Sequence, residues 1–361
     1  MAKYRFEQIA INSTEKKKPV EEDRFTYLGL EHLDSGSLKV TRFGSDVAPI
    51  GEKLVMRKGD VLFGKRRAYQ KKVAIAPFDG IFSAHGMVLR PNVEVIDPDF
   101  FPLFISSDYF LDAAIKISVG SLSPTINWRD LKILEFDLPD LETQRKLAAV
   151  LWSINDTMES YKKLISATDE LVKSQFIEMF GETKKVPLIQ LAAIVMGQSP
   201  SSDSYNTVGE GVPFYQGSGE FTDKYVGDSM FCTSPTRMAQ AGDVLMSVRA
   251  PVGTVNITTK DCCIGRGLAA IRSKFSADYN EYFLYAFRAM ADQLGSMGHG
   301  STILSINKNE LHNLMMPNAS LPEQMKFVRF AQQSDKSKFE LEQALAELTA
   351  TYKRIIAENF N

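Results

Sequence analysis

The chain has 361 residues, 44% of them hydrophobic, which is enough apolar material for two cores of ordinary domain size. Its net charge of −2 argues against a free-standing, strongly basic nucleic-acid binder, but local clusters of positive charge leave DNA binding open. No apolar stretch approaches the ~20 residues that cross a bilayer, and Met1–Phe6 lacks an apolar signal region, so a cytoplasmic protein is expected.

The sequence contains an internal repeat, in which the second half of the chain resembles the first. Residues 120–146 align without a gap with residues 300–326 and share 9 identities over 27 positions, where unrelated sequences would share roughly 2. Solenoid repeats are much shorter, about 20–50 residues. We therefore predict two similar globular units, residues 1–139 and 186–319, each followed by a connector, residues 140–181 and 321–360.

The repeat continues upstream of residue 120 with small insertions. Gly59-Asp60-Val61-Leu62 returns as Gly242-Asp243-Val244-Leu245. Gly86 and the apolar run after it are matched to Gly267 and the apolar run that follows it. The duplication therefore covers most of each predicted unit.

The first unit, residues 1–139, is predicted to be α+β and rich in strands. Segments such as 72–76 and 86–89 are short, β-branched or alternating, and bounded by Gly, Pro or Asp, which is typical of strands. Apolar periodicity predicts a helix over residues 102–117.

Basic residues interleaved with a Tyr and a Gln occupy positions 65–72. Arg and Lys neutralise phosphates, and Arg can bridge the O6 and N7 atoms of guanine. A solvated hairpin without a ligand is the alternative. The candidate DNA-binding residues of this run are Lys65, Arg66, Arg67, Tyr69 and Lys71.

A polar loop at residues 120–127 adds hydroxyl and amide side chains to the candidates. Such side chains can donate and accept hydrogen bonds at base edges or phosphates. They can equally cap turns and helices, and both interpretations stay open. The candidates are Ser121, Ser123, Thr125 and Asn127.

The first connector is predicted to be one long helix with a heptad seam. Apolar positions alternate at spacings of four and three over more than three heptads, and polar residues fill the other faces. Gly181 is a plausible end of the helix. The seam residues predicted to pair with another helix are Leu147, Leu151, Ile154, Met158, Tyr161, Ile165 and Val172.

The second unit, residues 186–319, repeats the pattern with a strand near 253–257 and a helix over 278–294. The prediction that its polar and cationic residues bind DNA depends on their equivalence to the candidates of unit 1 in the repeat. The candidate DNA-binding residues are Gln216, Ser247, Arg249, Arg266, Ser301, Thr302, Ser305 and Asn307.

The second connector continues the same seam with Leu341, Leu345, Leu348, Tyr352 and Ile355. Each helix would be roughly 55–60 Å long at about 1.5 Å per residue. A two-fold relation between the repeats would make the helices an antiparallel coiled coil. The alternative is that each helix packs only on its own unit.

Motifs for catalysis are missing from the sequence. It contains no phosphate-binding Gly-x4-Gly-Lys-Ser/Thr loop, no Gly-x-Ser-x-Gly elbow and no His-Glu-x-x-His metal motif. The four histidines are scattered, and the three cysteines do not form a disulfide framework or a zinc site. No catalytic residue, metal or cofactor is therefore predicted in this chain.

Residues 241–253 and 262–268 resemble a target-recognition domain of the DNA specificity subunits of type I restriction–modification systems. The tails around Leu138-Pro139 and Leu321-Pro322-Glu323-Gln324 resemble that family's Leu-Pro-Pro-Leu-x-Glu-Gln entry into each conserved helix. The resemblance covers essentially the whole chain. Asn318-Ala319-Ser320 departs from the usual Leu-Pro-Pro, and the chain is short for the family.

The resemblance implies a non-catalytic subunit that binds double-stranded DNA and reads a bipartite target, one half with each unit. The implied partners are two methyltransferase subunits and, in a restriction complex, two motor-nuclease subunits. S-adenosylmethionine and adenine methylation would belong to the methyltransferase partner. The alternatives are the specificity subunit of a system with fused methylase–nuclease partners, and a dimeric interaction scaffold without DNA function.

Overall fold

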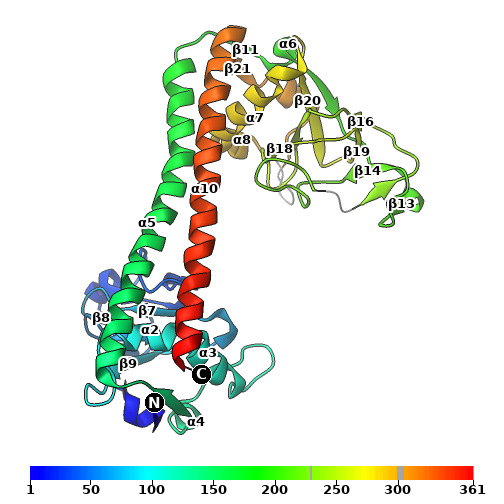
Figure 1. Cartoon of the computed structure of the whole chain (residues 1–361). Coiled ribbons are helices and arrows are strands. Elements are labelled where there is room, and N and C mark those ends of the chain that lie inside the picture. The colour runs from blue at the N-terminus through cyan, green and yellow to red at the C-terminus, as the bar shows by residue number, and fades with distance from the viewer. Residues whose placement is uncertain (228–229, 299–304, 361) are drawn as a thin grey trace. The chain divides into compact units, whose positions relative to one another are not determined.

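The computed structural model describes residues 1–227, 230–298 and 305–360. The chain divides into two compact units (Figure 1). Unit 1 comprises Met1–Ser160 and Ala344–Asn361, and unit 2 comprises Tyr161–Gln343. Both are α+β, as the sequence predicts. No helix among the described residues is both long and apolar enough to cross a membrane.

Unit 1 contains two four-stranded sheets and a strand pair. The first sheet has the order β2 (Ala10–Ser13), β9 (Met87–Pro91), β6 (Val61–Phe63), β7 (Val73–Ile75). The second has the order β3 (Lys16–Lys17), β5 (Lys53–Met56), β8 (Gly80–Phe82), β4 (Tyr27–Leu28). Strand β1 (Ala2–Arg5) pairs with β10 (Glu135–Leu138). The short helices are α1 (Phe6–Ile9), α2 (Phe101–Ser106), α3 (Asp108–Lys116) and α4 (Trp128–Leu131).

Unit 2 repeats this plan. One sheet has the order β12 (Ala192–Met196), β20 (Leu268–Ser273), β17 (Val244–Ser247), β18 (Val255–Ile257). The other has the order β13 (Tyr205–Asn206), β15 (Phe231–Cys232), β14 (Val212–Tyr215), β19 (Cys262–Ile264), β16 (Met238–Ala239). Strand β11 (Lys185–Pro187) pairs with β21 (Met315–Pro317). The short helices are α6 (Leu188–Leu191), α7 (Asn280–Ala289), α8 (Ala291–Met297) and α9 (Lys308–His312).

Strand register corrects one detail of the predicted repeat. Phe63 pairs with Met87, and Met246, which is equivalent to Phe63, pairs with Ala269. Met87 therefore corresponds to Ala269, and Gly86 does not correspond to Gly267. Ungapped matching of similar apolar runs cannot resolve a slip by one position, which the hydrogen-bonded ladder does resolve.

Each single helix predicted over 102–117 and 278–294 is broken into two. Ser107 has extended backbone angles, and its hydroxyl oxygen accepts a hydrogen bond from the Phe110 amide, so it ends α2 and caps α3. In unit 2 the break lies at Met290, between α7 and α8. Apolar periodicity predicts a buried face but not a change of axis within it.

The predicted connectors are two long helices, α5 (Leu141–Phe180) and α10 (Leu321–Phe360), of 40 residues each. A buried glutamine fixes the start of α5, since the Gln144 amide donates to the Pro139 and Val95 carbonyls and accepts from the Asp97 amide. Gln324 donates in the same way to the Ala319 carbonyl at the start of α10. A buried glutamine therefore closes the turn at the start of each long helix.

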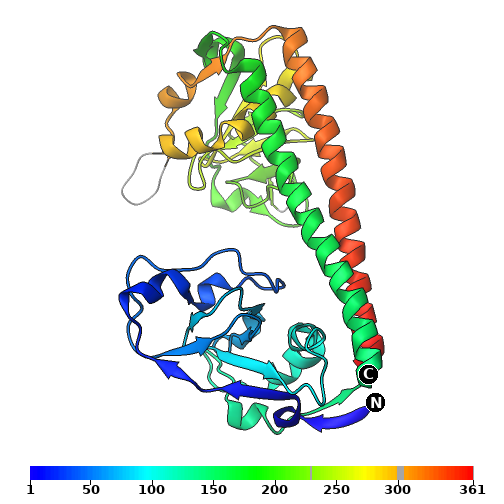
Figure 2. The same cartoon turned by 90° about the vertical axis from the view of Figure 1, so that its left-hand side faces the viewer.

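Within each unit the two long helices lie side by side and antiparallel (Figures 1 and 2). In unit 1, Leu151 of α5 and Ile356 of α10 share one core. In unit 2, Phe176 of α5 packs on Phe327 of α10 with ring centroids 5.5 Å apart. All the predicted seam residues are buried or half-buried, and α5 contacts α10 in each unit. The alternative was that each helix packs only on its own unit. The helices do pack on the globular parts as well, in the same cores where they contact each other.

An ion pair between a buried aspartate and a partly buried arginine occurs at the same place in both units. Asp60 lies directly before β6, and its carboxylate accepts two hydrogen bonds from the Arg90 guanidinium, at 2.7 and 2.9 Å. Asp243 accepts two from Arg272, at 2.6 and 2.7 Å. Both aspartates also cap the preceding turn. The repeated Gly-Asp-Val-Leu motif is therefore a structural element of each sheet.

We predict that Asp60→Ala lowers the free energy of unfolding of unit 1 by about 3 kcal/mol, because Arg90 loses its buried partner. Both tryptophans, Trp128 and Trp152, lie in unit 1, so tryptophan fluorescence during denaturation reports on this unit. Glu142→Ala removes an exposed pair with Lys146 and should change stability by less than about 0.5 kcal/mol. Equal effects of the two variants would contradict the structural role of Asp60.

Candidate nucleic-acid interface

In unit 1 the structure brings the basic run 65–72, here called the cationic turn, together with the polar loop 120–127. In unit 2 it brings the segment around Arg249, the equivalent cationic turn, together with the described end of the equivalent loop, residues 305–307. The Ile126 amide donates to the Lys65 carbonyl at 2.9 Å, and the Ile306 amide donates to the Val248 carbonyl at the same distance. The next residues form isolated β-bridges, Arg66 with Thr125 and Arg249 with Ser305. Segments far apart in the chain thus form one surface, with the same backbone pairing in each unit.

Arg66 is the most clearly positioned cation in unit 1. Its Nε donates to Ser123 Oγ at 3.0 Å, and its Nη1 lies 3.4 Å from His85 Nε2. An arginine N–H can only donate, so a hydrogen bond at this contact requires an unprotonated His85 Nε2. These contacts use two of the five N–H donors of an exposed guanidinium. Arg66 is therefore held in place and can still bind an anion or a guanine.

The electrostatic environment of Arg66 is strongly positive. Burial, together with the charges of Arg66, Lys65 and Lys53, lowers the pKa of His85. Burial and the charge of Lys16 lower the pKa of Lys65. The sequence left open whether His85 lies at a binding surface, and it did not single out Lys16 and Lys53, which lie outside the basic run. The pairing of β6 with β9 brings His85 beside Arg66, where the Arg66 amide donates to the His85 carbonyl at 3.3 Å.

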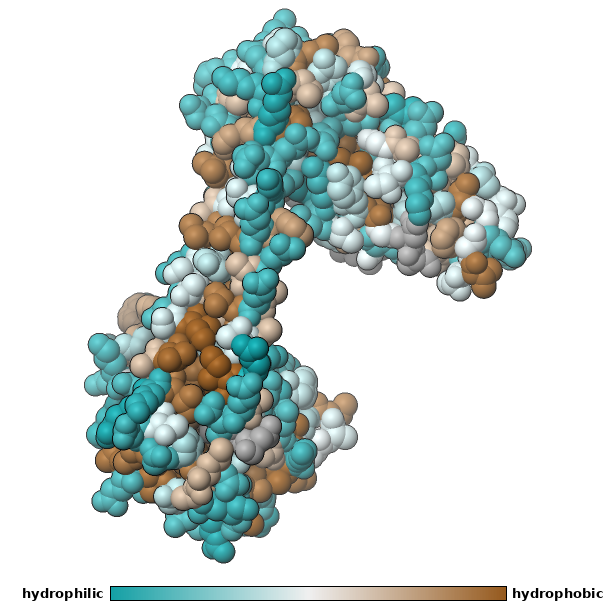
Figure 3. Space-filling view, viewed as in Figure 1, coloured by the Kyte–Doolittle hydropathy of each residue, from teal (hydrophilic) through white to brown (hydrophobic). Residues whose placement is uncertain are grey.

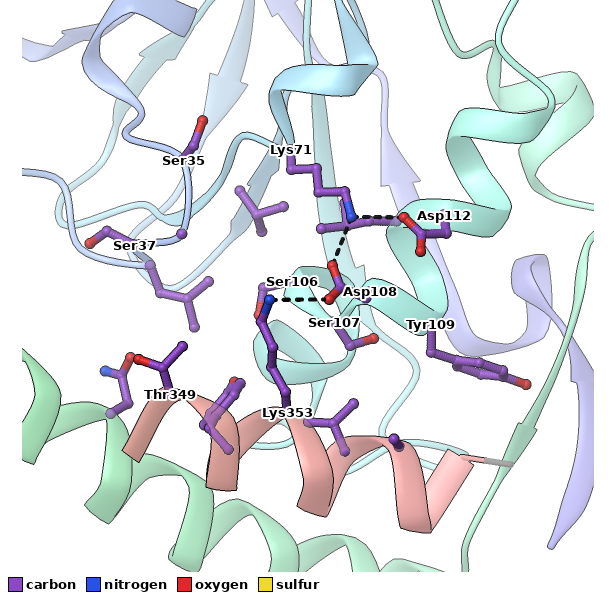
Figure 4. Close-up of a pocket in the computed structure, with 18 of the residues that line it drawn as sticks. Ser35, Ser37, Lys71, Ser106, Ser107, Asp108, Tyr109, Asp112, Thr349 and Lys353 are labelled. Carbon is purple, nitrogen blue, oxygen red and sulfur yellow. Dashed lines mark hydrogen bonds and ion pairs between the residues drawn. The ribbon is translucent and has the colours of Figure 1, made fainter. Parts of the chain in front are cut away.

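Lys71 was a candidate for DNA contact, but its charge is satisfied within the protein. Its Nζ donates to Asp108 and Asp112 of α3, each at 2.7 Å. Burial lowers the pKa of Lys71, but the two carboxylates outweigh burial and raise it. Figure 4 shows this side chain pointing into a cavity of about 870 Å³, where Lys353 of α10 also reaches Asp108. Lys71 therefore belongs to the packing of unit 1.

The polar loop of unit 1 is closed by backbone hydrogen bonds. The Val119 and Thr125 amides each donate to the other residue's carbonyl at 3.0 Å, and Gly120 turns the chain with a φ of 112°. The Arg67 amide donates to the Pro124 carbonyl at 2.8 Å. Ser121, Asn127, Arg67 and Tyr69 are exposed, and Thr125 is half-buried. These residues share a surface with Arg66.

In unit 2, Arg266 and Gln216 meet at a second junction of loops. The Arg266 amide donates to Ser199 Oγ at 3.3 Å. A Cβ atom on Gly267 would lie 2.5 Å from the Gln216 carbonyl oxygen, so only glycine fits this approach. Arg266 and Gln216 are both exposed, and the nearby Arg237, which sequence analysis missed, is exposed too. Arg249 is half-buried at the first junction.

Two of the remaining candidates have structural contacts. Ser247 is 2% exposed, and its hydroxyl donates to the Arg249 carbonyl at 2.7 Å. Asn307 caps α9, because its side-chain oxygen accepts from the Glu310 amide at 3.0 Å. The equivalent Asn127 makes no such cap at α4. Ser301 and Thr302 lie outside the described residues.

The arrangement suits recognition of a polyanion with base edges. Arginine, hydroxyl and amide side chains gather on loops that a rigid sheet holds, which is how phosphate and base contacts are usually built. Within residues 1–227, 230–298 and 305–360, no group of three or more His, Cys, Asp or Glu side chains could hold a metal ion. Fold and surface together define a duplicated recognition protein with a helical connector after each unit.

Comparison with known proteins places this class in a family. The family model for the type I restriction modification DNA specificity domain matches residues 17–167 and 181–349. The chain therefore belongs to the type I restriction–modification DNA specificity family. It is a specificity subunit and not an enzyme, as the resemblance implies.

Individual relatives agree with this assignment. The chain is 30% identical to the type I restriction enzyme MjaX specificity subunit of Methanocaldococcus jannaschii, over 82% of this chain and 76% of that protein. A chain from a structural study of complex assembly and conformational transition of the type I R-M system is 28% identical, covers 100% and 97% of the two chains, and has a TM-score of 0.67. The M. genitalium S subunit shares the fold at 14% identity, with coverage of 100% and 96% and a TM-score of 0.58.

We predict that Asn307 and Asn127 respond differently to removal of their side chains. Asn307→Ala removes a helix cap, which should cost about 1 kcal/mol and make the Glu310 amide exchange about fivefold faster. Asn127→Ala removes no cap and should leave the stability of unit 1 unchanged. Hydrogen exchange of residues 305–314 and tryptophan fluorescence of unit 1 measure the two effects. An unchanged exchange rate in Asn307→Ala would show that Asn307 is not a functioning cap.

Proposed function

We propose that this chain reads a bipartite DNA target for an adenine-methylating complex, with one half-site for each unit. One observation carries the proposal. Both units join a cationic turn to a polar loop in the same register, yet the side chains displayed there differ. A common frame with different side chains is what two readers of different half-sites require.

Unit 1 would bind its half-site through Arg66 and Arg67, with Lys53 and Lys65 close to the phosphates. Arg66 is held by Ser123 and His85, so little conformational entropy is lost when its remaining donors meet a guanine or a phosphate. Ser121, Thr125 and Asn127 would supply further polar contacts. These positive charges are local, so the net charge of −2 is no obstacle.

Unit 2 would use Arg266, Gln216 and Arg249. Arginine suits guanine and glutamine suits adenine in the major groove, and the close packing of Gly267 against Gln216 holds these two loops together. Ser247 and Asn307 would act by shaping the junction, because their side chains are occupied within the protein.

The partners would be two methyltransferase subunits, together with two motor-nuclease subunits in a restriction complex. Apolar residues with heptad-related spacing, Val150, Leu164 and Leu171, are 50–52% exposed along α5. Figure 3 also shows apolar side chains gathered beside α10 in unit 1. Such surfaces favour docking of protein partners. The methyltransferase would bring S-adenosylmethionine and flip the adenine, and the complex would act in the cytoplasm.

Exchange of one unit tests the proposal directly. Residues 186–319 are replaced by the equivalent segment of a relative with a different target, and α5 and α10 are retained. Methylome sequencing of a host that expresses the methyltransferase should then show one altered half-site, one unaltered half-site and an unchanged spacer. A change in both halves, or in neither, would contradict modular reading.

We further predict that the charges of residues 65–67 set the salt dependence of DNA binding. Replacing Lys65, Arg66 and Arg67 by Gln should weaken binding to all duplexes and make the slope of log K against log salt shallower by about one unit for each lost phosphate contact. Lys71→Gln is the matched control, because Lys71 is paired with Asp108 and Asp112. Equal slopes for the triple variant and the wild type would place the phosphate contacts elsewhere.

A further inference from the structure

Leu122 stands out because it is 94% exposed at the tip of the polar loop of unit 1. Single exposed leucines are common on protein surfaces and need no explanation by themselves. This one lies between Ser121 and Ser123, and Ser123 is the residue whose hydroxyl holds the Arg66 guanidinium at 3.0 Å. Its position, rather than its exposure alone, makes it informative.

The backbone around Leu122 is fixed before any ligand binds. Val119 and Thr125 close the loop with two mutual hydrogen bonds, and the Thr125 hydroxyl donates to the Ser123 carbonyl at 3.1 Å. The Pro124 carbonyl accepts from the Arg67 amide at 2.8 Å. The tip is therefore tied to the cationic turn on the side that follows Leu122, and it has little freedom to fold back onto the protein.

The position of Leu122 determines what it meets when the cationic turn binds DNA. Consecutive Cα atoms are about 3.8 Å apart, so Leu122 stays within a few ångströms of the Ser123–Arg66 contact. Phosphates offer nothing to an aliphatic side chain. The apolar group that a duplex presents in its major groove is the 5-methyl group of thymine.

We propose that Leu122 reads a thymine methyl group in the half-site of unit 1. This inference rests on the proposed function and adds to it a specificity-determining residue of a chemistry that the polar candidates lack. Arg66 would hold the loop against the DNA, and Leu122 would then favour thymine at one position of the half-site. A wedge of Leu122 between base steps would be a different interaction, because it would not depend on the methyl group.

The test pairs a change in the protein with a change in the DNA. The assembled methyltransferase is titrated with the cognate duplex, with a scrambled duplex, and with duplexes in which each thymine of the half-site and of the two flanking base pairs is replaced by uracil. The proteins are the wild type and the Leu122→Ala, Leu122→Met and Val93→Ala variants. Val93 is the matched control, because it is 62% exposed and lies beyond the far end of β9 from His85.

Replacement of one particular thymine by uracil should weaken wild-type binding about fourfold, the value expected for the loss of one buried methyl group. Leu122→Ala should be weaker on the cognate duplex by at least that factor and insensitive to the same uracil. Leu122→Met should restore the sensitivity, and Val93→Ala should match the wild type. Because Leu122 is exposed, its removal should leave the unfolding of unit 1 unchanged.

The outcomes separate this inference from the proposed function. If the wild type binds cognate and scrambled duplexes equally, both the proposed function and the thymine contact of Leu122 are wrong. A wild type that prefers its cognate duplex but is insensitive to every uracil would overturn the thymine contact alone. A Leu122→Ala variant as sensitive to uracil as the wild type would overturn it too, as would a Leu122→Ala loss of affinity that is the same on every duplex.

Discussion

The rest of the structure depends on the packing of the two long helices in each core. In each unit, the C-terminal end of one long helix packs against the N-terminal part of the other. Unit 1 buries Leu151 from the start of α5 with Ile356 from the end of α10, and unit 2 buries Phe176 from the end of α5 with Phe327 from the start of α10. The core of unit 1 is therefore completed by residues from the far end of the chain, whereas unit 2, Tyr161–Gln343, takes both helix segments from its own continuous stretch. A unit cut out at its sequence boundaries would expose this apolar surface. Exchange of a recognition unit can succeed only when both helices are retained.

The two units share their supports and differ at their tips. The Asp–Arg pairs at Asp60 and Asp243 and the glutamine closures at Gln144 and Gln324 recur in equivalent places. The aspartates and glutamines are buried and hydrogen-bonded, and their arginine partners are partly buried, so a change in one partner leaves polar groups unsatisfied at a cost of a few kcal/mol. Exposed candidates such as Arg67, Gln216 and Arg266 carry no such constraint, because their side chains face water. Divergence of the tips on an unchanged frame gives different recognition without a different fold.

Periodicity predicted the long helices almost to the residue, since a heptad seam has one structural solution over this length. The short helices were harder, because Ser107 changes the direction of the chain without interrupting the apolar pattern. The site was predicted in part. Arg66 and Ser123 were both candidates from the sequence, but only the fold brings them and His85 together. Composition identifies residues that can bind DNA, whereas the fold decides which of them have already found partners inside the protein.

Lys71 and Arg66 show how that decision is made within one basic run. Arg67 and Lys71 flank the short turn Ala68–Gln70, and both have the left-handed backbone conformation, with φ of 53° and 48°. Such angles are uncommon outside glycine and store strain of about 1 kcal/mol or more at each residue. Hydrogen bonds from Arg67 to Pro124 and from Lys71 to Ala68 offset part of that strain. The turn separates the two ends of the run, so that Lys71 reaches Asp108 and Asp112 while Arg66 stays with Ser123 at the surface. The strained turn therefore directs one cation of the run into the packing of unit 1 and leaves another exposed at the surface.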